Sequence, residues 1–251
     1  MIQVIERSFA VVEHIAAHEA ASVKDLAEAC GLAKGTLCNI LRTLSGLGYV
    51  AKGKDRLWML GPKWREVAWP QFERDCLAKT VRQAVVELAN ASGETAQAAI
   101  LRGGERYVIA EARAQQGLTV DPLALPPSGP FGTATGRVLL AHAPEPEAEA
   151  LHKACKTLDA DWPEAKRIGN FRKALSAIRE TGMASLTSGS GEVVGLAAPV
   201  FGRAREAAAA LGIYLPVVRF SGAHEKTVTH ELNASAKRAS VCLQAALGES
   251  V

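Results

Sequence analysis

The 251-residue sequence predicts an α+β protein with two domains, a helical N-terminal domain and a larger domain in which helices cover one sheet. Two observations support this fold class. Apolar residues repeat with the helical period of about 3.6 up to residue 92 and with a period near 2 from Glu94 onward. In the second domain, predicted helices come before, between and after the strands, which is typical of a sheet covered by helices.

The composition fits a cytoplasmic protein with a substantial core. Hydrophobic residues make up 48% of the chain, and the net charge of +3 is unremarkable. The five cysteines are widely spaced, odd in number and without a C-x-x-C pair, which favours reduced thiols. Charged residues interrupt the first apolar stretch, and no uncharged apolar run reaches about 18 residues. We therefore expect neither a signal peptide nor a membrane span.

The chain begins with an amphipathic pattern that predicts a helix starting almost at the first residue. We expect its apolar stripe to pack behind the next two helices and complete their core. The stripe consists of Ile2, Ile5, Phe9, Val12, Ile15 and Ala16.

Residues 22–50 predict two short helices joined by a tight turn. Ser22 followed by Asp25 resembles a capping box and places the start of the first helix near Val23. Gly31 follows that helix at the position where a left-handed conformation can end it. A second helix begins near Lys34, and its apolar stripe is Leu37, Ile40, Leu41, Leu44 and Leu47.

The opposite face of the second helix is small, polar and basic, which suits a helix that enters the DNA major groove. The alternative is an ordinary helical hairpin with a solvated face. Local charge favours DNA binding, because residues 30–65 contain seven basic side chains and one acidic one, whereas residues 1–29 contain two and five. The candidate DNA-binding residues here are Ser22, Lys34, Gly35, Thr36, Cys38, Asn39, Arg42 and Thr43.

A basic hairpin is predicted directly after this helix. Residues 49–51 begin an extended segment, residues 52–55 form a turn, and residues 56–60 return as a strand. Such a hairpin is a wing, whose basic side chains contact phosphate or the minor groove and add salt-dependent affinity. The candidates are Lys52, Lys54 and Arg56.

Residues 1–64 resemble the winged helix-turn-helix domain of IclR-type bacterial transcription regulators. The matching motifs are VIERS at 4–8, LAKGT at 32–36, LRTL at 41–44, GYV at 48–50 and LGP at 60–62. The resemblance implies that residues 34–42 form the DNA-reading helix. Gly35, Cys38 and Asn39 stand where the family often has Ser, His and Arg, so we expect a different operator.

Residues 65–76 are expected to form a helical linker, because Gly61-Pro62 and Pro70 interrupt regular structure. We predict one short helix there, then a long helix from Phe72 to about Ala91 that leads into a second domain at residues 77–251. A single winged helix reads few base pairs, so we expect a homodimer or a dimer of dimers on a pseudo-palindromic operator. In IclR-type proteins the N-terminal domains and the linker form much of the dimer contact.

The second domain is predicted as strands interspersed with helices. A hairpin turns at Gly103-Gly104 between residues 95–101 and 106–112. Further strands are expected at 118–123, 182–187, 192–201 and 207–217, and helices at 133–142, 147–154, 171–181 and 224–247. Residues 156–169 are interpreted as a surface connection. The inward residues of the last helix are predicted to be Val228, Leu232, Ala236, Ala239, Cys242 and Ala246.

Residues 72–248 resemble the effector-binding domain of the same family, a GAF-like fold. The motifs are TATGR at 133–137, ALSAIRETG at 174–182 and LAAPVF at 196–201. In that family the ligand lies between the loop before the 133–142 helix and the sheet. The resemblance therefore implies an effector-binding site made by Phe131, Ala134, Thr135, Ser185, Thr187, Gly195, Gly212 and Tyr214.

The residues at these positions indicate a ring-bearing carboxylate as the effector. Gly195 and Gly212 leave room, and residues 185–187 lack the Asp that is common in the family, which removes a repulsion toward anions. We expect the acid group at backbone N–H groups near Ala134 and Thr135, where the start of a helix favours negative charge. Tyr214 would donate a hydrogen bond or cover the ring. The alternative is that aromatic side chains fill the cavity.

No catalytic, metal or cofactor site is expected. The glycine-rich loop at 129–137 lacks P-loop spacing, and residues 187–191 lack the G-x-S-x-G spacing of a nucleophile elbow. The sequence therefore predicts a cytoplasmic regulator that binds double-stranded DNA and a small-molecule effector. The alternatives are an enzyme domain fused to a DNA-binding module and an architectural DNA-binding protein without a ligand.

Overall fold

The computed structural model describes residues 2–53, 56–113, 120, 129–203 and 206–248. The chain divides into two compact units, Met1–Arg74 and Asp75–Val251, each with its own hydrophobic core. The fold class is α+β, as predicted. A winged helix-turn-helix forms the first unit, and a five-stranded sheet with helices forms the second.

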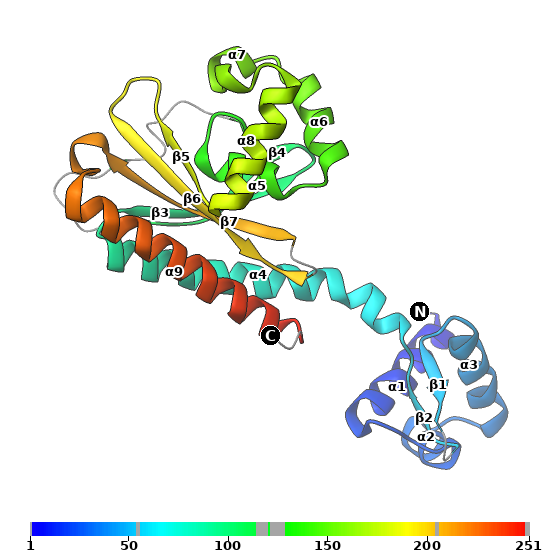
Figure 1. Ribbon diagram of the computed structural model, residues 1–251. Coiled ribbons are helices and arrows are strands. Elements are labelled where there is room, and N and C mark those ends of the chain that lie inside the picture. The colour runs from blue at the N-terminus through cyan, green and yellow to red at the C-terminus, as the bar shows by residue number, and fades with distance from the viewer. Residues whose placement is uncertain (1, 54–55, 114–119, 121–128, 204–205, 249–251) are drawn as a thin grey trace. The chain divides into compact units, whose positions relative to one another are not determined.

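In the N-terminal unit, the described residues before α4 (Lys63–Ser92) form three helices and a two-stranded hairpin (Figure 1). The elements are α1 (Gln3–His18), α2 (Val23–Cys30), α3 (Lys34–Gly46), β1 (Val50–Lys52) and β2 (Trp58–Leu60). β1 and β2 pair antiparallel, which confirms the predicted hairpin. The buried core consists of Val11, Val12, Ile15, Ala21, Leu26, Leu32, Leu37, Ile40, Leu41 and Val50.

Local signals at α2 explain the sharp corner of the helix-turn-helix. The Ser22 hydroxyl accepts a hydrogen bond from the Asp25 backbone N–H, and the Asp25 carboxylate accepts one from the Ser22 backbone, which confirms the predicted capping box. Hydrogen bonds from the Ser22 side chain and backbone lower the pKa of the Asp25 carboxyl. Gly31 ends the helix at φ +62°, a left-handed conformation that glycine adopts without strain.

The apolar stripe predicted on α1 is buried only in its C-terminal half. Val12 and Ile15 pack in the core, whereas the apolar side chains in the first turns of the helix are exposed. The reason is length, because α1 has 16 residues and its neighbour α2 has 8. The residues that were expected in the core and are exposed instead are Ile2, Ile5, Phe9 and Ala16.

Two further residues of this unit lie differently from the prediction. Leu47, expected in the stripe of α3, is 59% exposed because the helix ends at Gly46 and Leu47 is its C-cap. Arg56 has φ +61° and belongs to the turn, so β2 begins at Trp58. Lys54 lies outside the described residues.

One helix replaces the predicted linker and its break. α4 (Lys63–Ser92) is continuous and contains Pro70. A proline inside a helix removes one backbone hydrogen bond, a local cost that the flanking turns can offset. The predicted short helix and the separate helix start at Phe72 are therefore wrong.

The C-terminal unit is built on an antiparallel sheet in the order β4-β3-β7-β6-β5. Its strands are β3 (Thr95–Arg102), β4 (Glu105–Ala112), β5 (Ala184–Thr187), β6 (Val193–Phe201) and β7 (Ala207–Pro216). Gly103 and Gly104 both have positive φ, as a two-residue hairpin turn requires, and the predicted hairpin is confirmed. The strand predicted at 118–123 lies outside the described residues, apart from Val120.

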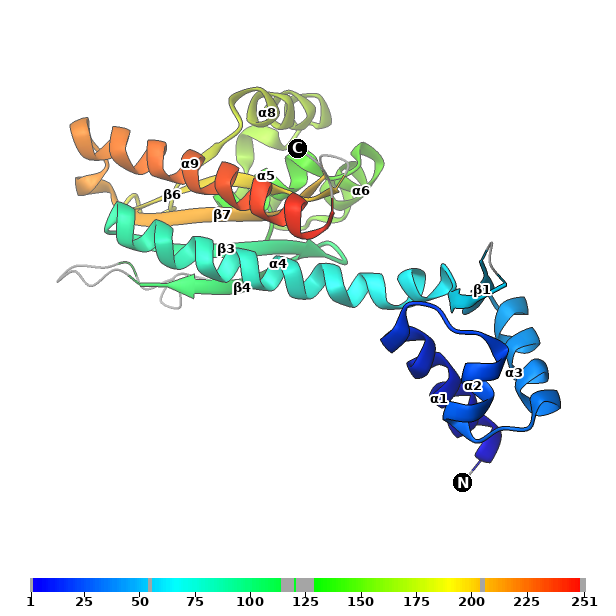
Figure 2. The same cartoon turned by 90° about the horizontal axis from the view of Figure 1, so that it is seen from below.

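Helices cover both faces of this sheet (Figures 1 and 2). α5 (Ala134–His142), α6 (Glu145–Ala154), α7 (Leu158–Asp161) and α8 (Ile168–Thr181) lie on one side, and α5 packs directly on β3, β6 and β7. α9 (Gly222–Ala246) and the C-terminal part of α4 lie on the other side. Within the described ranges, every helix is too short or too polar to cross a lipid bilayer.

The 156–169 segment contributes to the core and is more than the surface connection predicted for it. α7 and the short helix η2 (Pro163–Ala165) turn it back against α8. Leu158, Trp162 and Ala165 are buried, and the Trp162 ring lies edge-on to Phe171 at 5.9 Å. The large apolar ring of Trp162 accounts for this packing.

The buried face of α9 differs from the prediction near the end of the helix. Val228, Leu232, Ala236 and Ala239 are buried as expected, whereas Cys242 and Ala246 are exposed. Steps of four residues from Ala239 place Leu243 and Leu247 on the buried face instead.

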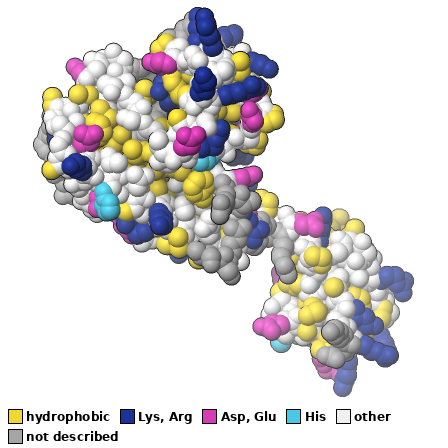
Figure 3. All heavy atoms as spheres, in the orientation of Figure 1, with side chains coloured by type: hydrophobic (Ala, Val, Ile, Leu, Met, Phe, Trp, Pro, Cys, Tyr) yellow, Lys and Arg dark blue, Asp and Glu magenta, His cyan; other side chains and the backbone are white. Residues whose placement is uncertain are grey.

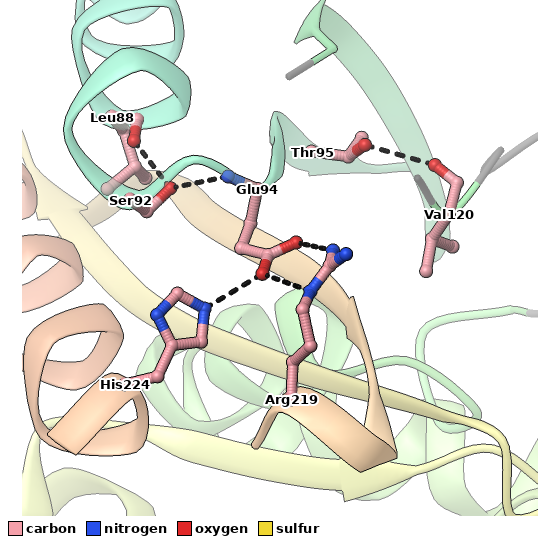
Figure 4. A network of polar contacts seen from close by, with 7 residues as sticks. All are labelled: Leu88, Ser92, Glu94, Thr95, Val120, Arg219 and His224. Atoms are coloured by element: carbon pink, nitrogen blue, oxygen red, sulfur yellow. Dashed lines mark hydrogen bonds and ion pairs between the residues drawn. The ribbon is translucent and has the colours of Figure 1, made fainter. Parts of the chain in front are cut away.

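A buried ion pair ties the start of β3 to the start of α9 (Figure 4). Glu94 is 1% exposed and accepts hydrogen bonds from Arg219 of η4 (Val217–Arg219), one of them 2.8 Å from Nε. His224 Nε2 lies 2.8 Å from the same carboxylate, and the Ser92 hydroxyl accepts the Glu94 backbone N–H. Because a buried carboxylate is costly without partners, these contacts fix the junction between α4 and β3.

Candidate functional site

Strand register brings several of the predicted effector residues to one face of the sheet. Gly195 pairs with Tyr214, and Gln97 pairs with Gly212, so these four residues point to the same side. This is the side covered by α5, because positions 195 and 212 face its first residues. Leu186 pairs with Gly195 and lies on the same face.

Two buried polar side chains form a pair on this face. Gln97 Nε2 donates a hydrogen bond to Tyr214 Oη at 2.7 Å. Burial raises the pKa of the Tyr214 hydroxyl, although the charge of Arg106 and a hydrogen bond with Thr135 act in the opposite direction. Tyr214 is therefore a neutral phenol at physiological pH and can donate a hydrogen bond.

Arg106 of β4 brings a positive charge to the same place. Its Nη1 donates a long hydrogen bond of 3.4 Å to Thr135 Oγ1. Its Nε is buried and has no hydrogen-bond partner in the described part of the chain. Because buried N–H groups in native proteins are nearly always paired, this group is a candidate ligand contact.

The start of α5 is held close to the loop that precedes it. The Thr133 hydroxyl caps the helix by accepting the Gly136 backbone N–H at 3.1 Å. A Cβ on Gly136 would lie 2.2 Å from the Pro130 carbonyl oxygen, so only glycine permits this approach. The TATGR motif thus places Ala134 firmly at the helix start.

Arg137, the last residue of that motif, holds two loops together. Its Nε donates to the Phe131 carbonyl and its Nη2 to the Asp161 carbonyl, each at 2.8 Å. Its guanidinium lies 4.1 Å from the centroid of the Trp162 ring. Burial lowers the pKa of Arg137 to about 10, against the opposing charges of Glu164 and Asp161, so the side chain stays protonated at neutral pH.

A cavity of about 490 Å³ lies between the sheet, the start of α5 and the α7–η2 segment. Small-molecule sites commonly have volumes of about 300–1,000 Å³. Arg106 borders the cavity from the sheet side, and Asp161 and Glu164 border it from the α7–η2 segment. Other lining residues include Gln97, Ala134, Leu186, Thr187, Gly195 and Tyr214.

The cavity lining contains some of the predicted effector residues and lacks others. Ala134, Thr187, Gly195 and Tyr214 line it. Phe131 is packed in the aromatic core instead, and Thr135 has no exposed surface. Ser185 is exposed on the other face of the sheet, because strand residues alternate and its neighbour Leu186 faces α5.

Protein side chains lie close to both glycines of the sheet. A Cβ on Gly212 would lie 2.6 Å from Thr135 Cγ2, so the threonine methyl already occupies that space. A Cβ on Gly195 would lie 3.3 Å from the Tyr214 ring. The prediction that both glycines enlarge the ligand site is therefore wrong for Gly212, which does not line the cavity. Gly195 lines the cavity and leaves room for the Tyr214 ring, which forms part of the cavity wall.

Sequence reasoning missed Gln97 and Arg106. Gln97 offered a signal, since it is a lone polar residue in the apolar run 96–101, and a buried polar residue is more informative than an exposed apolar one. Arg106 offered none, because charged residues are ordinary on an edge strand such as β4.

The N-terminal unit exposes the polar face predicted on α3. Cys38 is partly exposed, and the exposed residues are Lys34, Gly35, Thr36, Asn39, Arg42 and Thr43. Figure 3 shows Lys and Arg side chains gathered on the side of this unit where α3 lies. The helix therefore presents the residue types that contact base edges and phosphates.

The remaining DNA-binding candidates lie at the start of α2 and in the hairpin. The Ser22 hydroxyl donates to the Asp25 carboxylate at 2.7 Å, so capping α2 occupies it. Lys52 is exposed, with its ammonium 6.0 Å from the centroid of the Trp58 ring. Arg56 is exposed in the turn between the strands.

Two family models match the two units of the chain. The IclR helix-turn-helix domain matches residues 4–53. The model described as bacterial transcriptional regulator IclR C-terminal matches residues 72–241. The second model describes a transcriptional regulator, and the partner of such a protein is DNA.

Known proteins resemble the chain over most of its length. The glycerol operon regulatory protein of Streptomyces griseus is 30% identical over 228 residues, which cover 87% of this chain and 86% of that protein. The HTH-type transcriptional regulator BhcR of Paracoccus denitrificans is 24% identical over 230 residues, with coverages of 88% and 80%.

Solved structures share the fold. Thermotoga maritima IclR has a TM-score of 0.58 at 20% identity and covers 97% of this chain and 99% of its own. An IclR homologue from Microbacterium hydrocarbonoxydans, solved in complex with 4-hydroxybenzoate, has a TM-score of 0.57 at 20% identity, with coverages of 96% and 99%. Family models, relatives and fold agree, and the chain belongs to the IclR family of bacterial transcriptional regulators.

Proposed function

We propose that this regulator binds a small carboxylate effector in its C-terminal cavity and that the effector changes its affinity for an operator. The observation that carries the proposal is the 490 Å³ cavity, whose sheet wall holds the hydrogen-bonded pair Gln97 and Tyr214. A concave site with apolar walls and a few fixed polar groups is the usual form of a small-molecule site.

The proposed effector class is a ring-bearing carboxylate. Ala134, Leu186 and Val193 supply apolar wall, and the Tyr214 ring lies beside them, which suits a flat apolar ligand. The acid group would lie toward the start of α5, where the helix dipole favours negative charge. The Microbacterium homologue with bound 4-hydroxybenzoate supports this class of ligand.

Calorimetry on the full chain tests the proposal. The titration panel contains two- and three-carbon acids, benzoate and 4-hydroxybenzoate. We expect an aromatic acid to bind more tightly than the short acids, and Tyr214→Ala to weaken that binding. Binding of the short acids alone, or an affinity that Tyr214→Ala leaves unchanged, would contradict the proposed effector class.

We propose that the exposed face of α3 reads the operator, with Arg42 as its central basic residue. Arg42→Ala should weaken binding by about 1–3 kcal/mol if the side chain contacts a guanine, or reduce the salt slope by about one unit if it contacts only phosphate. Fluorescence anisotropy with DNA selected by the protein from a random pool measures both quantities. Unchanged affinity together with an unchanged slope would refute the assignment.

We propose that the protein acts as a homodimer or a dimer of dimers on a pseudo-palindromic operator. One winged helix contacts few base pairs, and a dimer with a two-fold axis doubles the number of base pairs that are contacted. The exposed apolar side chains of Ile2, just before α1, and of Ile5 and Phe9 on α1 supply surface that a second copy would cover. Light scattering on the protein with operator DNA should give at least a dimer mass, and a monomer mass would contradict the proposal.

A further inference from the structure

Two arginines border the cavity, and their hydrogen bonds distinguish them. Arg137 already donates to two backbone carbonyls and lies over the Trp162 ring. Its charge also lies close to Asp161 and Glu164. A ligand would therefore have to displace existing contacts in order to bind Arg137.

Arg106 has unused donor capacity. A guanidinium carries five N–H groups, and within the described residues Arg106 has one long hydrogen bond, to Thr135 Oγ1. Its buried Nε has no partner. A buried unpaired donor on a charged group costs free energy that a ligand acceptor would recover, so the position is prepared for an anion.

The two sides of the cavity differ in charge. The acidic side chains of Asp161 and Glu164 border it from the α7–η2 segment and would repel a carboxylate. Arg106 borders it from the sheet, beside the Tyr214 hydroxyl, whose pKa responds to the arginine charge. An anionic group is therefore favoured at the end of the cavity where Arg106 and Tyr214 meet the start of α5.

We infer that Arg106 binds the acid group of the effector and makes the site selective for anions over their neutral analogues. This inference rests on the proposed function, since it assigns one residue to the ligand of the same cavity. A guanidinium can donate two parallel N–H groups to a carboxylate, and such charge-assisted hydrogen bonds are stronger than neutral ones.

The test compares an acid with its amide on the full chain by calorimetry. The probe pair is 4-hydroxybenzoate and 4-hydroxybenzamide, and benzoate with benzamide is a second pair. Wild type should bind the acid at least about 10-fold more tightly than the amide. Arg106→Gln should weaken acid binding by about 10- to 100-fold, leave amide binding nearly unchanged, and so abolish the discrimination.

Two further variants test whether the loss of acid binding comes from the arginine side chain itself or from a general effect of mutating the domain. Arg106→Lys keeps the charge without the paired donors, so its acid affinity should lie between those of wild type and Arg106→Gln. Arg102→Gln is the matched control, because Arg102 is exposed at the end of β3 and does not line the cavity. Its ligand affinities should equal those of wild type.

The outcomes distinguish this inference from the proposed function. If wild type binds the acid and Arg106→Gln binds it equally well, the role of Arg106 is refuted while effector binding in the cavity stands. Equal binding of acid and amide by wild type also refutes it. If wild type binds none of the aromatic or short acids, the proposed function fails and the inference fails with it.

Discussion

The contact between Gly212 and Thr135 allows the packing beneath the cavity to be tested by mutation. In Gly212→Ala the new Cβ would lie 2.6 Å from Thr135 Cγ2. Carbon atoms in contact prefer about 3.5–4.0 Å, so the methyl would have to move by roughly 1 Å. Thr135 has no exposed surface, and overpacking of this kind costs about 1–3 kcal/mol.

A second substitution should relieve the clash. Thr135→Ser removes Cγ2 and keeps the hydroxyl, at a cost of about 1 kcal/mol for the lost methyl. In the double variant the new Cβ occupies space that the methyl has left, and its next contact is the Leu196 carbonyl oxygen at 3.2 Å. The double variant should therefore be about as stable as Thr135→Ser alone, which corresponds to a coupling of about 1–3 kcal/mol.

Urea unfolding followed by circular dichroism measures these free energies. Gly169→Ala is the control, because a Cβ there meets nothing within 4 Å and α8 should gain up to about 1 kcal/mol. Additive losses in the double variant, or no loss in Gly212→Ala, would refute the claim that the threonine methyl fills the space at Gly212.

Further predictions concern the core and its ionisable groups. Gly136→Ala should lower the unfolding free energy by about 3 kcal/mol, because its Cβ would lie 2.2 Å from the backbone oxygen of Pro130; an unchanged urea midpoint would refute that contact. Phe171→Ala should cost about 3–5 kcal/mol, since the side chain has no exposed surface, and a Tm lowered by only a degree or so would argue against its burial. Glu94→Gln should cost about 1.5–3 kcal/mol through weaker hydrogen bonding with the Arg219 guanidinium, measured by urea unfolding, and no loss would contradict the ion pair. Burial, with a neighbouring arginine, lowers the pKa of His142, so the stability that its neutral form contributes is present above about pH 6.5 and lost as the pH falls through the lowered pKa. Between about pH 7 and pH 5, His142→Asn should lose less unfolding free energy than wild type, and equal losses would count against this assignment.

Local chemistry made the N-terminal unit predictable from sequence. The Ser22–Asp25 capping box, the left-handed Gly31 and the stripe of α3 are signals that lie within a few residues of the structure they specify. The sequence could not show which part of each helix is covered by a neighbouring element. The exposure of Phe9 on α1 depends on the length of its neighbours, and the continuous helix through Pro70 runs against the usual local signal of a proline.

The cavity was harder to predict because its residues come from elements far apart in the chain. The family resemblance located Ala134 and Tyr214, and both line the cavity. Ser185 was predicted in the site, but its neighbour Leu186 lines the cavity instead, since adjacent strand residues face opposite sides. Small residues at the site suggested open space, but only the packed structure shows that Thr135 fills it at Gly212.

The Glu94 carboxylate gains its partners late when the chain is synthesised from its N-terminus. Arg219 and His224 lie 125 and 130 residues further along the chain, and α9, which covers β6 and β7, begins beside them. Until these residues have left the ribosome, Glu94 is better hydrated than buried, and β6 and β7 lack the cover of α9. The C-terminal unit therefore cannot be completed progressively during translation. Its last helix packs only after contacts form between residues more than 100 positions apart in the sequence, and such long-range contacts favour slow, cooperative folding. Chaperones can bind the incomplete unit during this time.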